Sequence, residues 1–491
     1  MKKWIHGNFH SMQHPDEMFH EMVTDQGIIL GFDEEIKHLR CDDIIDLNDH
    51  HVYPGFIDAH LHLLGYGRFI SLIDLRTIDH KTDVFLMLQN HRHKEILYAE
   101  GYRDLGITKD ELDSIIPDKP VFLRHLDYHS LTLNTKALTR VGMNNDLGIL
   151  REEDAMQALQ RLPKHSKEEL KGMLTHAIQS LHRLGITGAD SDDLYYFNGF
   201  SETFSVFDEV VKEIPFRAHL LMHHETISDF VQSGKPWGEQ HPFLELGAVK
   251  MFYDGTMSSK TALMKDPYRG TDQYGEIVMG KAHFIETLKR TRALGLNAAI
   301  HVIGDQGLDD VAHLLKTYPP KAGLKDRIIH APWAMKKTVH HLASIPMTID
   351  IQPQFLSSDL PKALTHFSQT PELIFPWKTY RDAGIPLLGS SDAPVETPNP
   401  LLGIKDAIYR ESNHNHQAYQ IEESLPVFEA IKLYTTYAHH QHRNKQRGYL
   451  LKGMLADFVV TSSDLMTINK QQWNDDLIEM TVVDERIVYQ R

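Results

Sequence analysis

Short apolar or β-branched runs alternate with longer segments of helical periodicity along most of the chain. The runs lie at 54–62, 186–191, 215–222, 246–253, 296–303, 327–331, 346–352 and 385–391. Residues 167–184 (KEELKGMLTHAIQSLHRL) place apolar side chains on one face of a helix, and residues 426–438 follow a similar pattern. This alternation predicts repeated βα units and therefore a parallel α/β fold.

Eight predicted parallel strands separated by helices favour a closed (β/α)8 TIM barrel, although the strand count alone also fits an open, doubly wound sheet. The connection between the first two strands is far longer than an ordinary βα loop. A strand at 119–125 and a helix after Glu152 predict that this connection is ordered. We therefore expect an inserted subdomain over about 66–165.

The two ends of the chain share a different pattern. Strand-like runs occur at 27–31, 43–47, 456–461 and 480–489. With 491 residues, the chain is long enough for one large core and a smaller one. We expect a small β-sandwich-like domain formed from both termini, residues 1–53 plus 440–491, beside a barrel over 54–439.

Composition narrows the class of protein. Hydrophobic residues make up 41% and charged residues 24%, a balance typical of ordered globular proteins. The net charge of −16 argues against a nucleic-acid partner, since such proteins carry excess Lys and Arg. Cys41 has no partner for an internal disulfide, and no apolar run resembles a signal peptide or a membrane span. We expect a cytoplasmic protein that does not bind membranes.

The first predicted strand ends in candidate metal ligands. Asp58, His60 and His62 are spaced by two residues, so on a strand their side chains project to the same face. Imidazole nitrogens placed in this way can share one divalent ion. The alternative is a pair of buried histidines whose rings are hydrogen-bonded within the core.

Recurrence of such residues favours the metal site. Four other predicted strands end in Lys250, His301, His330 and Asp392. The carboxyl ends of the strands meet at one mouth of a barrel, which is where barrel enzymes place their active sites. Histidine nitrogens suit zinc, and an aspartate can also accept a proton from water that the ion has acidified. The pattern predicts a divalent metal, with zinc expected, acting on a small-molecule substrate.

Several motifs point to a known family. PGFIDAHLH resembles the first-strand HxH signature of the amidohydrolase superfamily. VKMFYDGTMSSKTA, HVIGDQGLDDV, RIIHAPW and GSSDAPVETPNPLLGI resemble later motifs of its YtcJ-like group, amidohydrolase family 3, and LKGMLADFVV resembles the closing strand pair. These motifs follow the family's order nearly from end to end.

The resemblance implies a role for each candidate ligand. His60 and His62 would bind one ion, and His301 and His330 would bind a second. Lys250 would be a carboxylated lysine that bridges the two ions, and Asp392 would be both a ligand and the general base. In the alternative, Lys250 forms a salt bridge with Asp254 and the site holds a single ion.

The chain also departs from the family pattern. Where the group usually has Gly-Ser-Arg-Thr, Lys260 replaces the bidentate arginine with a point charge. His129, within LRHLDYHSLTLN, is a candidate substrate contact, together with Lys260 and Asp254. Asp58, Asp254 and Asp305 lie close enough in sequence to orient the ligating histidines.

The resemblance implies a metal-dependent hydrolase of carbon–nitrogen bonds other than peptide bonds, acting on an amide, formamide or cyclic amide. Two alternatives stay open. One is a hydrolytic deaminase with a mononuclear site, and the other is a non-catalytic regulator that retains the fold. The oligomeric state is also open, with a homo-oligomer among the alternatives.

Overall fold

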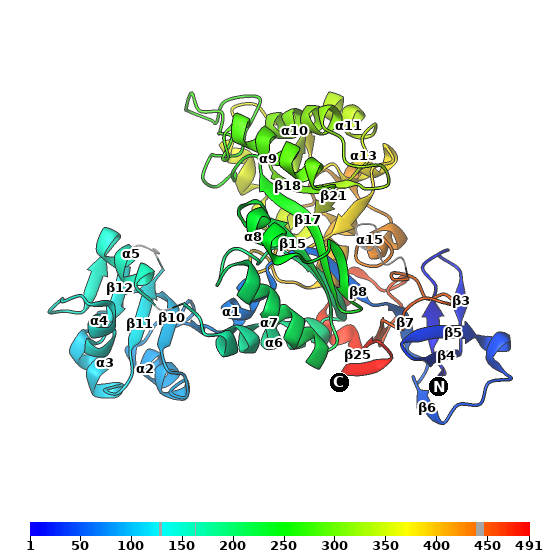
Figure 1. Cartoon of the computed structure of the whole chain (residues 1–491), viewed down its shortest axis with the longest axis horizontal. Helices are drawn as coiled ribbons and strands as arrows, with labels where there is room; N and C mark the ends of the chain where they lie inside the picture. Colours follow the sequence, from blue (N-terminus) through cyan, green and yellow to red (C-terminus); the bar gives the residue numbers. More distant parts are fainter. Residues whose placement is uncertain (127–129, 163, 438–445) are drawn as a thin grey trace. The chain divides into compact units, whose positions relative to one another are not determined.

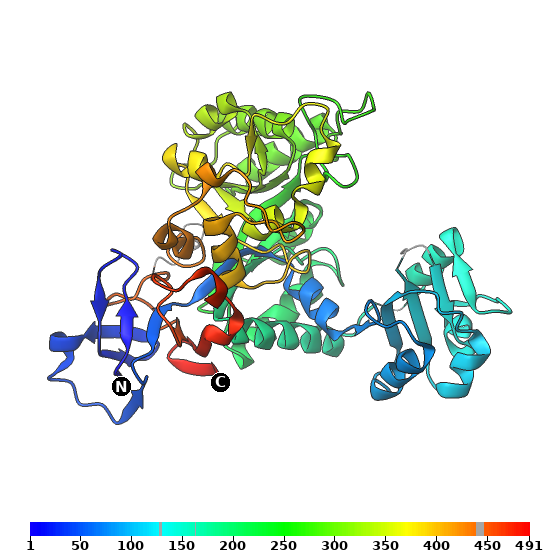
Figure 2. The ribbon, with the colours of Figure 1, turned by 180° about the vertical axis from the view of Figure 1, so that it is seen from behind.

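The computed structural model describes residues 1–126, 130–162, 164–437 and 446–491 (Figures 1 and 2). It consists of two compact units. The larger comprises Met1–Gly67 and Lys167–Arg491, and the smaller is Arg68–Ser166. Among the described residues, no helix combines the length and the apolar character needed to cross a bilayer.

The larger unit contains an eight-stranded parallel barrel. Its strands run in the order β23-β21-β19-β18-β17-β15-β14-β8. They are β8 (Phe56–Leu61), β14 (Ile186–Ser191), β15 (Arg217–His223), β17 (Leu244–Phe252), β18 (Ala298–Val302), β19 (Asp326–His330), β21 (Met347–Ile351) and β23 (Leu387–Gly389). The N–H of Asp392, just beyond β23, donates to the carbonyl oxygen of His60 at 2.8 Å and closes the ring. The predicted TIM barrel is confirmed, with all eight strands where they were expected.

Helices cover the outside of this ring (Figure 1). They are α6 (Lys167–Arg183), α7 (Phe200–Glu213), α8 (Ile227–Ser233), α9 (Lys281–Ala293), α10 (Asp305–Thr317), α11 (Lys336–Leu342), α12 (Pro353–Asp359), α13 (Trp377–Asp382), α14 (Pro400–Tyr409) and α15 (Val427–Leu433). The α6 helix matches the amphipathic prediction and buries Leu170, Leu174 and Ala177. The helix expected over 426–438 is shorter than predicted, because α15 ends at Leu433 and a turn follows.

Alternation along the strands carries polar side chains to the barrel mouth. Leu221, Ala248, Ala299 and Ile329 form a small apolar cluster of their own inside the ring. His223, Lys250 and His301 each follow one of these residues, Leu221, Ala248 and Ala299, by two positions on the same strand. Since successive side chains of a strand point to opposite faces, these polar residues also face the interior, one layer nearer the carboxyl ends.

Below the mouth, one buried arginine ties the strands together. The guanidinium of Arg327 on β19 donates two hydrogen bonds to Asp350 on β21, at 3.0 and 2.6 Å. It also donates to Asp190 on β14 and to the carbonyl oxygen of Ala59 on β8. Asp190 in turn lies 3.0 Å from Nδ1 of His219 on β15. This cluster of opposite charges, fully enclosed in protein, therefore joins five strands.

Both chain termini form the β-rich part of the larger unit, and they lie side by side in both views (Figures 1 and 2). One sheet has the order β5-β4-β1-β6, and the other β26-β25-β24-β7-β2-β3. The strands are β1 (Lys2–Ile5), β2 (Asn8–His10), β3 (Met18–Phe19), β4 (Met22–Asp25), β5 (Ile28–Phe32), β6 (Asp43–Asp46), β7 (His51–Pro54), β24 (Phe458–Thr461), β25 (Ile478–Val483) and β26 (Arg486–Gln490). A shared core containing Trp4, Ile29, Val52 and Phe458 lies between them.

The run 480–489, expected as one strand, is a hairpin. β25 ends at Val483, and β26 begins at Arg486 and pairs back on it in antiparallel register. The two residues between them, Asp484 and Glu485, both have a φ of 55°. Two consecutive left-handed residues are typical of a tight hairpin turn, so backbone geometry divides what the sequence pattern presented as one strand.

The smaller unit, Arg68–Ser166, has a five-stranded sheet in the order β13-β12-β11-β10-β9. Its elements are β9 (Ile73–Asp74), α2 (Lys81–Asn90), β10 (Leu97–Tyr102), α3 (Lys109–Ile115), β11 (Val121–His125), β12 (Ser130–Leu133), α4 (Thr135–Val141), β13 (Ile149–Arg151) and α5 (Glu152–Gln160). It has two apolar clusters of its own, one around Leu97 and Leu123 and the other around Leu131 and Leu138.

Replacing Arg327 tests the buried charge cluster. We expect Arg327→Ala to lower the free energy of unfolding by about 3–5 kcal/mol, because it leaves two buried carboxylates without their cation. The matched control is Arg486→Ala, whose exposed guanidinium lies 3.9 Å from Asp484; we expect a change within about 0.5 kcal/mol. Denaturant titration followed by circular dichroism measures both. A wild-type midpoint for Arg327→Ala would contradict the assignment.

Candidate metal centre

Three predicted ligands from two neighbouring strands converge at the barrel mouth. His60 and His62 come from the end of β8, and Asp392 follows β23. Oδ1 of Asp392 lies 3.3 Å from Nε2 of His60 and 3.6 Å from Nε2 of His62. Two imidazole nitrogens and a carboxylate oxygen thus face a common point, as a borderline metal such as zinc requires.

Backbone conformation aims two of the side chains. Because Arg327 and Ile329 face the barrel interior, strict alternation would turn His330 outward. His330 instead has a φ of 83°, and Asp392 has a φ of 57°. Residues other than glycine adopt this left-handed region at a cost of about 1–3 kcal/mol, and such residues cluster at functional sites. The strand ends therefore leave regular geometry where the candidate ligands stand.

His301 and His330 face each other, and the two ring nitrogens that meet are both hydrogen-bond acceptors. Nδ1 of His330 lies 2.8 Å from Oε1 of Gln352, and Nε2 of His301 lies 3.3 Å from the carbonyl oxygen of Gly255. Because both partners are acceptors, each imidazole places its single hydrogen there. The inner nitrogens, His330 Nε2 and His301 Nδ1, are 2.9 Å apart with lone pairs opposed. A cation bound between them would remove that repulsion.

Lys250 lies at the centre of the group. Its side chain is buried, and Nζ lies 3.0 Å from Nε2 of His60 and 3.5 Å from Oδ2 of Asp192. Burial lowers the pKa of the Lys250 ammonium, although the Asp192 carboxylate opposes this effect. The alternative prediction, a salt bridge between Lys250 and Asp254, is wrong in its partner. The carboxylate that Lys250 contacts is that of Asp192.

Charges within the site shift the neighbouring groups in opposite directions. Burial alone would lower the pKa of His62, but its contact with the Asp392 carboxylate raises that pKa to about 9. The same contact helps hold the pKa of Asp392 below its usual value, against the effect of burial. Burial raises the pKa of Asp192 to about 6. Without a metal, one positive charge on His62 therefore balances the Asp392 carboxylate.

Sequence reasoning missed several residues at the same mouth. Asp192 and Asp193 follow β14, His223 ends β15, and Gln352 follows β21. Oδ1 of Asp193 lies 4.0 Å from Nδ1 of His62, and Gln352 orients His330. The run of aspartates at 190, 192 and 193 was a visible signal, since it ends a predicted strand as the other candidates do.

Other predicted residues have different surroundings. The carboxylate of Asp254 accepts hydrogen bonds from the backbone N–H groups of Ile303, Gly304 and Leu263, which argues against the predicted substrate contact. The structure also describes three other predicted residues, Asp305, Asp58 and Lys260. Asp305 accepts from Lys265 N–H, Asp58 accepts from the backbone of His60 and the hydroxyl of Ser391, and Lys260 is half-buried in a turn. Asp58 thus holds the strand ends rather than an imidazole ring. His129 lies outside the described residues.

Aromatic rings surround the ligand group. The ring of Tyr196, in the loop after β14, meets His62 edge-on at 5.8 Å. The ring of Phe355 stacks on His330 at 5.9 Å, and Phe252 lies 5.5 Å from His301. These rings contact three of the candidate imidazoles, and Tyr196, which is 47% exposed, marks the side of the site that is open to solvent.

Comparison with known proteins gives consistent results. The model of the amidohydrolase family matches residues 43–489. The putative amidohydrolase YtcJ of Bacillus subtilis (strain 168) is 32% identical over 535 aligned positions that cover all of both chains. The N-substituted formamide deformylase of Arthrobacter pascens is 23% identical, covering 94% of this chain and 93% of the relative. An uncharacterized metal-dependent hydrolase from Pyrococcus horikoshii OT3 superposes with a TM-score of 0.83 at 23% identity, covering 96% and 99% of the two chains.

Substitution of Gln352 tests whether the opposed histidines bind a metal. We expect Gln352→Ala to weaken metal binding by about 10- to 100-fold, because His330 loses the acceptor that fixes its tautomer. The control is Gln354→Ala, a buried glutamine two residues further along the chain. Competition with a chelator of known affinity measures both variants. Equal affinity in the two would contradict the proposed role of Gln352.

Proposed function

The chain belongs to the amidohydrolase family, and we propose that it hydrolyses a non-peptide carbon–nitrogen bond in an amide, formamide or cyclic amide. The predicted class, a metal-dependent hydrolase of carbon–nitrogen bonds, is confirmed by that membership. The proposal concerns the bond and the residues that act on it. A formamide is the first substrate to test, because one full-length relative carries the name N-substituted formamide deformylase.

One observation carries the proposal: ligand atoms of the types that zinc prefers gather around a buried lysine. Nε2 of His60 and Nε2 of His62 lie 3.3 and 3.6 Å from Oδ1 of Asp392, and the three ligand atoms lie within 4.8 Å of one another. His301 and His330 add two nitrogens whose lone pairs oppose each other at 2.9 Å. A core built only for stability would pair these groups with hydrogen-bond donors. The donor set fits one or two divalent ions, for which zinc is our proposal.

Residues of the chain supply the proton transfers. A divalent ion in this site would act as a Lewis acid toward water and toward the scissile carbonyl. The low pKa of Asp392 keeps its carboxylate ionised at neutral pH, so one of its oxygens can accept the proton of the attacking water. Asp392 then returns that proton to the leaving nitrogen.

Carboxylation of Lys250 is the second part of the proposal. A buried amine with a lowered pKa is neutral more often than an exposed one, and the neutral nitrogen is the nucleophile toward carbon dioxide. The nitrogen would bond to the carbon of carbon dioxide and release one proton to solvent. The product is a carbamate with one negative charge and two oxygens. Those oxygens would add to the ligands that the histidines and Asp392 supply.

Substitution of Asp392 tests the general base. We expect Asp392→Asn to lower kcat on an active substrate by at least about 10²-fold, since the amide cannot take a proton from water. The control is Asp309→Asn, a buried aspartate of α10 bound by Lys337 and Thr338, and we expect it to retain activity. A panel of formamides, amides and cyclic imides provides the assay. Undiminished turnover by Asp392→Asn would contradict the role of Asp392 as general base.

Metal content tests the carbamate. We expect wild-type protein kept in bicarbonate to bind two ions at the barrel mouth, and Lys250→Ala to bind one or none, because the bridging group is lost. Elemental analysis of both proteins, stripped and reloaded with zinc, measures the difference. A Lys250→Ala protein with the wild-type stoichiometry would show that Lys250 holds no metal.

A mononuclear deaminase is the second candidate, and the contact of Lys250 with Asp192 favours it. If the unmodified ammonium is neutralised by that carboxylate at 3.5 Å, the site keeps a single ion at His60, His62 and Asp392. Such a site can release ammonia from an amidine-like ring. Ammonia release from aminated heterocycles, with one metal ion at the mouth, would favour this candidate over the amide hydrolase.

A further inference from the structure

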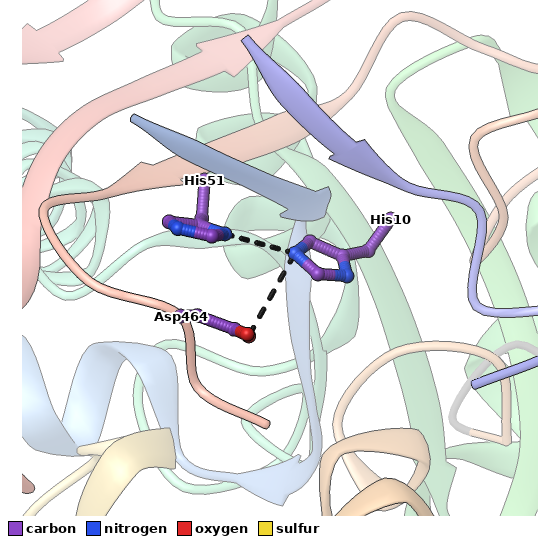
Figure 3. A group of neighbouring side chains, drawn as sticks. All are labelled: His10, His51 and Asp464. Atoms are coloured by element: carbon purple, nitrogen blue, oxygen red, sulfur yellow. Dashed lines mark hydrogen bonds and ion pairs between the residues drawn. The ribbon is translucent and has the colours of Figure 1, made fainter. Parts of the chain in front are cut away.

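A second group of ligand-type side chains lies in the terminal β domain, outside the barrel. It consists of His10 at the end of β2, His51 at the start of β7 and Asp464 in the loop after β24, and we call it the terminal histidine site (Figure 3). Strand β7 lies between β2 and β24, which brings the three residues together. Nothing in the proposed hydrolysis uses them.

We propose that the terminal histidine site binds a divalent transition-metal ion, with zinc the expected occupant. Nε2 of His10 lies 3.0 Å from Nδ1 of His51 and 3.8 Å from Oδ1 of Asp464 (Figure 3). Ligand atoms about 2.0–2.1 Å from a tetrahedral ion are about 3.3 Å from each other, and the two measured distances lie on either side of that value. The ligand atoms of His51 and Asp464 also lie within 4.8 Å of each other.

The surrounding contacts orient the ligands as in a metal site. The ring of His10 stacks on that of Tyr53 with centroids 4.4 Å apart and planes at 4°. The hydroxyl of Tyr53 donates to Oδ1 of Asp464 at 2.7 Å, and the N–H of Met466 donates to the same oxygen at 2.9 Å. Hydrogen bonds of this kind to a ligating carboxylate hold it in place and are typical of the groups behind metal ligands.

Burial holds the ring of His10 in place without closing the site. His10 is 7% exposed, and its ring stacks with those of Tyr53 and His51, with centroids 4.4 and 5.3 Å apart. Since His51 and Asp464 are only partly buried, an ion can enter and a water molecule can complete its coordination.

A third group of histidines shows by contrast what disfavours a metal. Asp309 on α10 lies near His313 and His341. The carboxylate of Asp309 is paired with a cation, because Nζ of Lys337 lies 2.9 Å from one of its oxygens. The lysine ammonium provides the positive charge there. At the terminal histidine site, the side chain of Asp464 contacts Tyr53, Met466, Thr467 and His10, and among the described residues these contacts include no lysine or arginine.

Bound metal would join both ends of the chain. His10 and His51 come from the N-terminal segment and Asp464 from the C-terminal segment, so one ion would fasten β2, β7 and the loop after β24. An ion that binds only the folded state stabilises that state. The role we infer is structural, and it is independent of turnover at the barrel mouth.

The experiment counts zinc in the full-length protein after stripping and reloading. We expect His51→Gln and Asp464→Asn each to hold one equivalent less than wild type. The control, His50→Gln, changes the preceding histidine and keeps the wild-type number. Asp464→Asn retains an oxygen for the Tyr53 hydroxyl, so it covers the case in which His51→Gln fails to fold.

Because the readout is metal content, it does not depend on finding a substrate, and failure here would leave the hydrolase proposal untouched. Equal zinc content in wild type, His51→Gln and Asp464→Asn would overturn the inference. A crystal of the wild-type protein measured at the zinc absorption edge gives an independent test. We expect an anomalous peak between His10 and His51, and its absence under saturating zinc would also overturn the proposal.

Discussion

The guanidinium of Arg327 joins four barrel strands, two of which, β8 and β19, carry candidate metal ligands. It is fully buried and balanced by two carboxylates, Asp190 and Asp350, while its remaining bond reaches the carbonyl of Ala59. Ala59 immediately precedes His60, so the arginine sets the height of the first ligand strand, β8, relative to β19, the strand of His330. A charge in this position is stable only if all its partners are in place. β8 therefore cannot shift along β19 without breaking the cluster.

Above this cluster, the site depends on departures from regular strand geometry. The left-handed backbone at His330 and Asp392 turns two side chains toward the same mouth as His60 and His62. Hydrogen bonds to Gln352 and Gly255 then fix which imidazole nitrogens carry hydrogen. The barrel strands fix the positions of the candidate ligands, and the backbone at the strand ends fixes the direction of their side chains. The hydrogen bonds behind His301 and His330 then fix which ring nitrogen carries hydrogen.

Two histidine groups in this chain differ in how their charges are balanced. At the barrel mouth, the positive charge of His62 compensates Asp392, and Lys250 contacts Asp192. At the terminal histidine site, two imidazoles meet a carboxylate that accepts a hydrogen bond from Tyr53. The first group includes an ionisable lysine beside the candidate ligands, whereas the contacts of Asp464 among the described residues include no lysine or arginine. We therefore infer a catalytic role for the first group and a structural role for the second.

The sequence alone predicted parallel βα units and favoured the barrel over an open sheet, because eight such units can close into a ring. It also determined the family, because the family's motifs recur in order. The candidate ligands His60, His62, Lys250, His301, His330 and Asp392 were also visible, since each stands at the end of a predicted strand. Only the tertiary structure decided the partners. Asp192 rather than Asp254 faces Lys250, Gln352 rather than an aspartate orients His330, and His10 meets Asp464 from the opposite end of the chain. Such pairs join strands that are neighbours in space and distant in sequence, and periodicity holds no information about the distance between side chains on different strands.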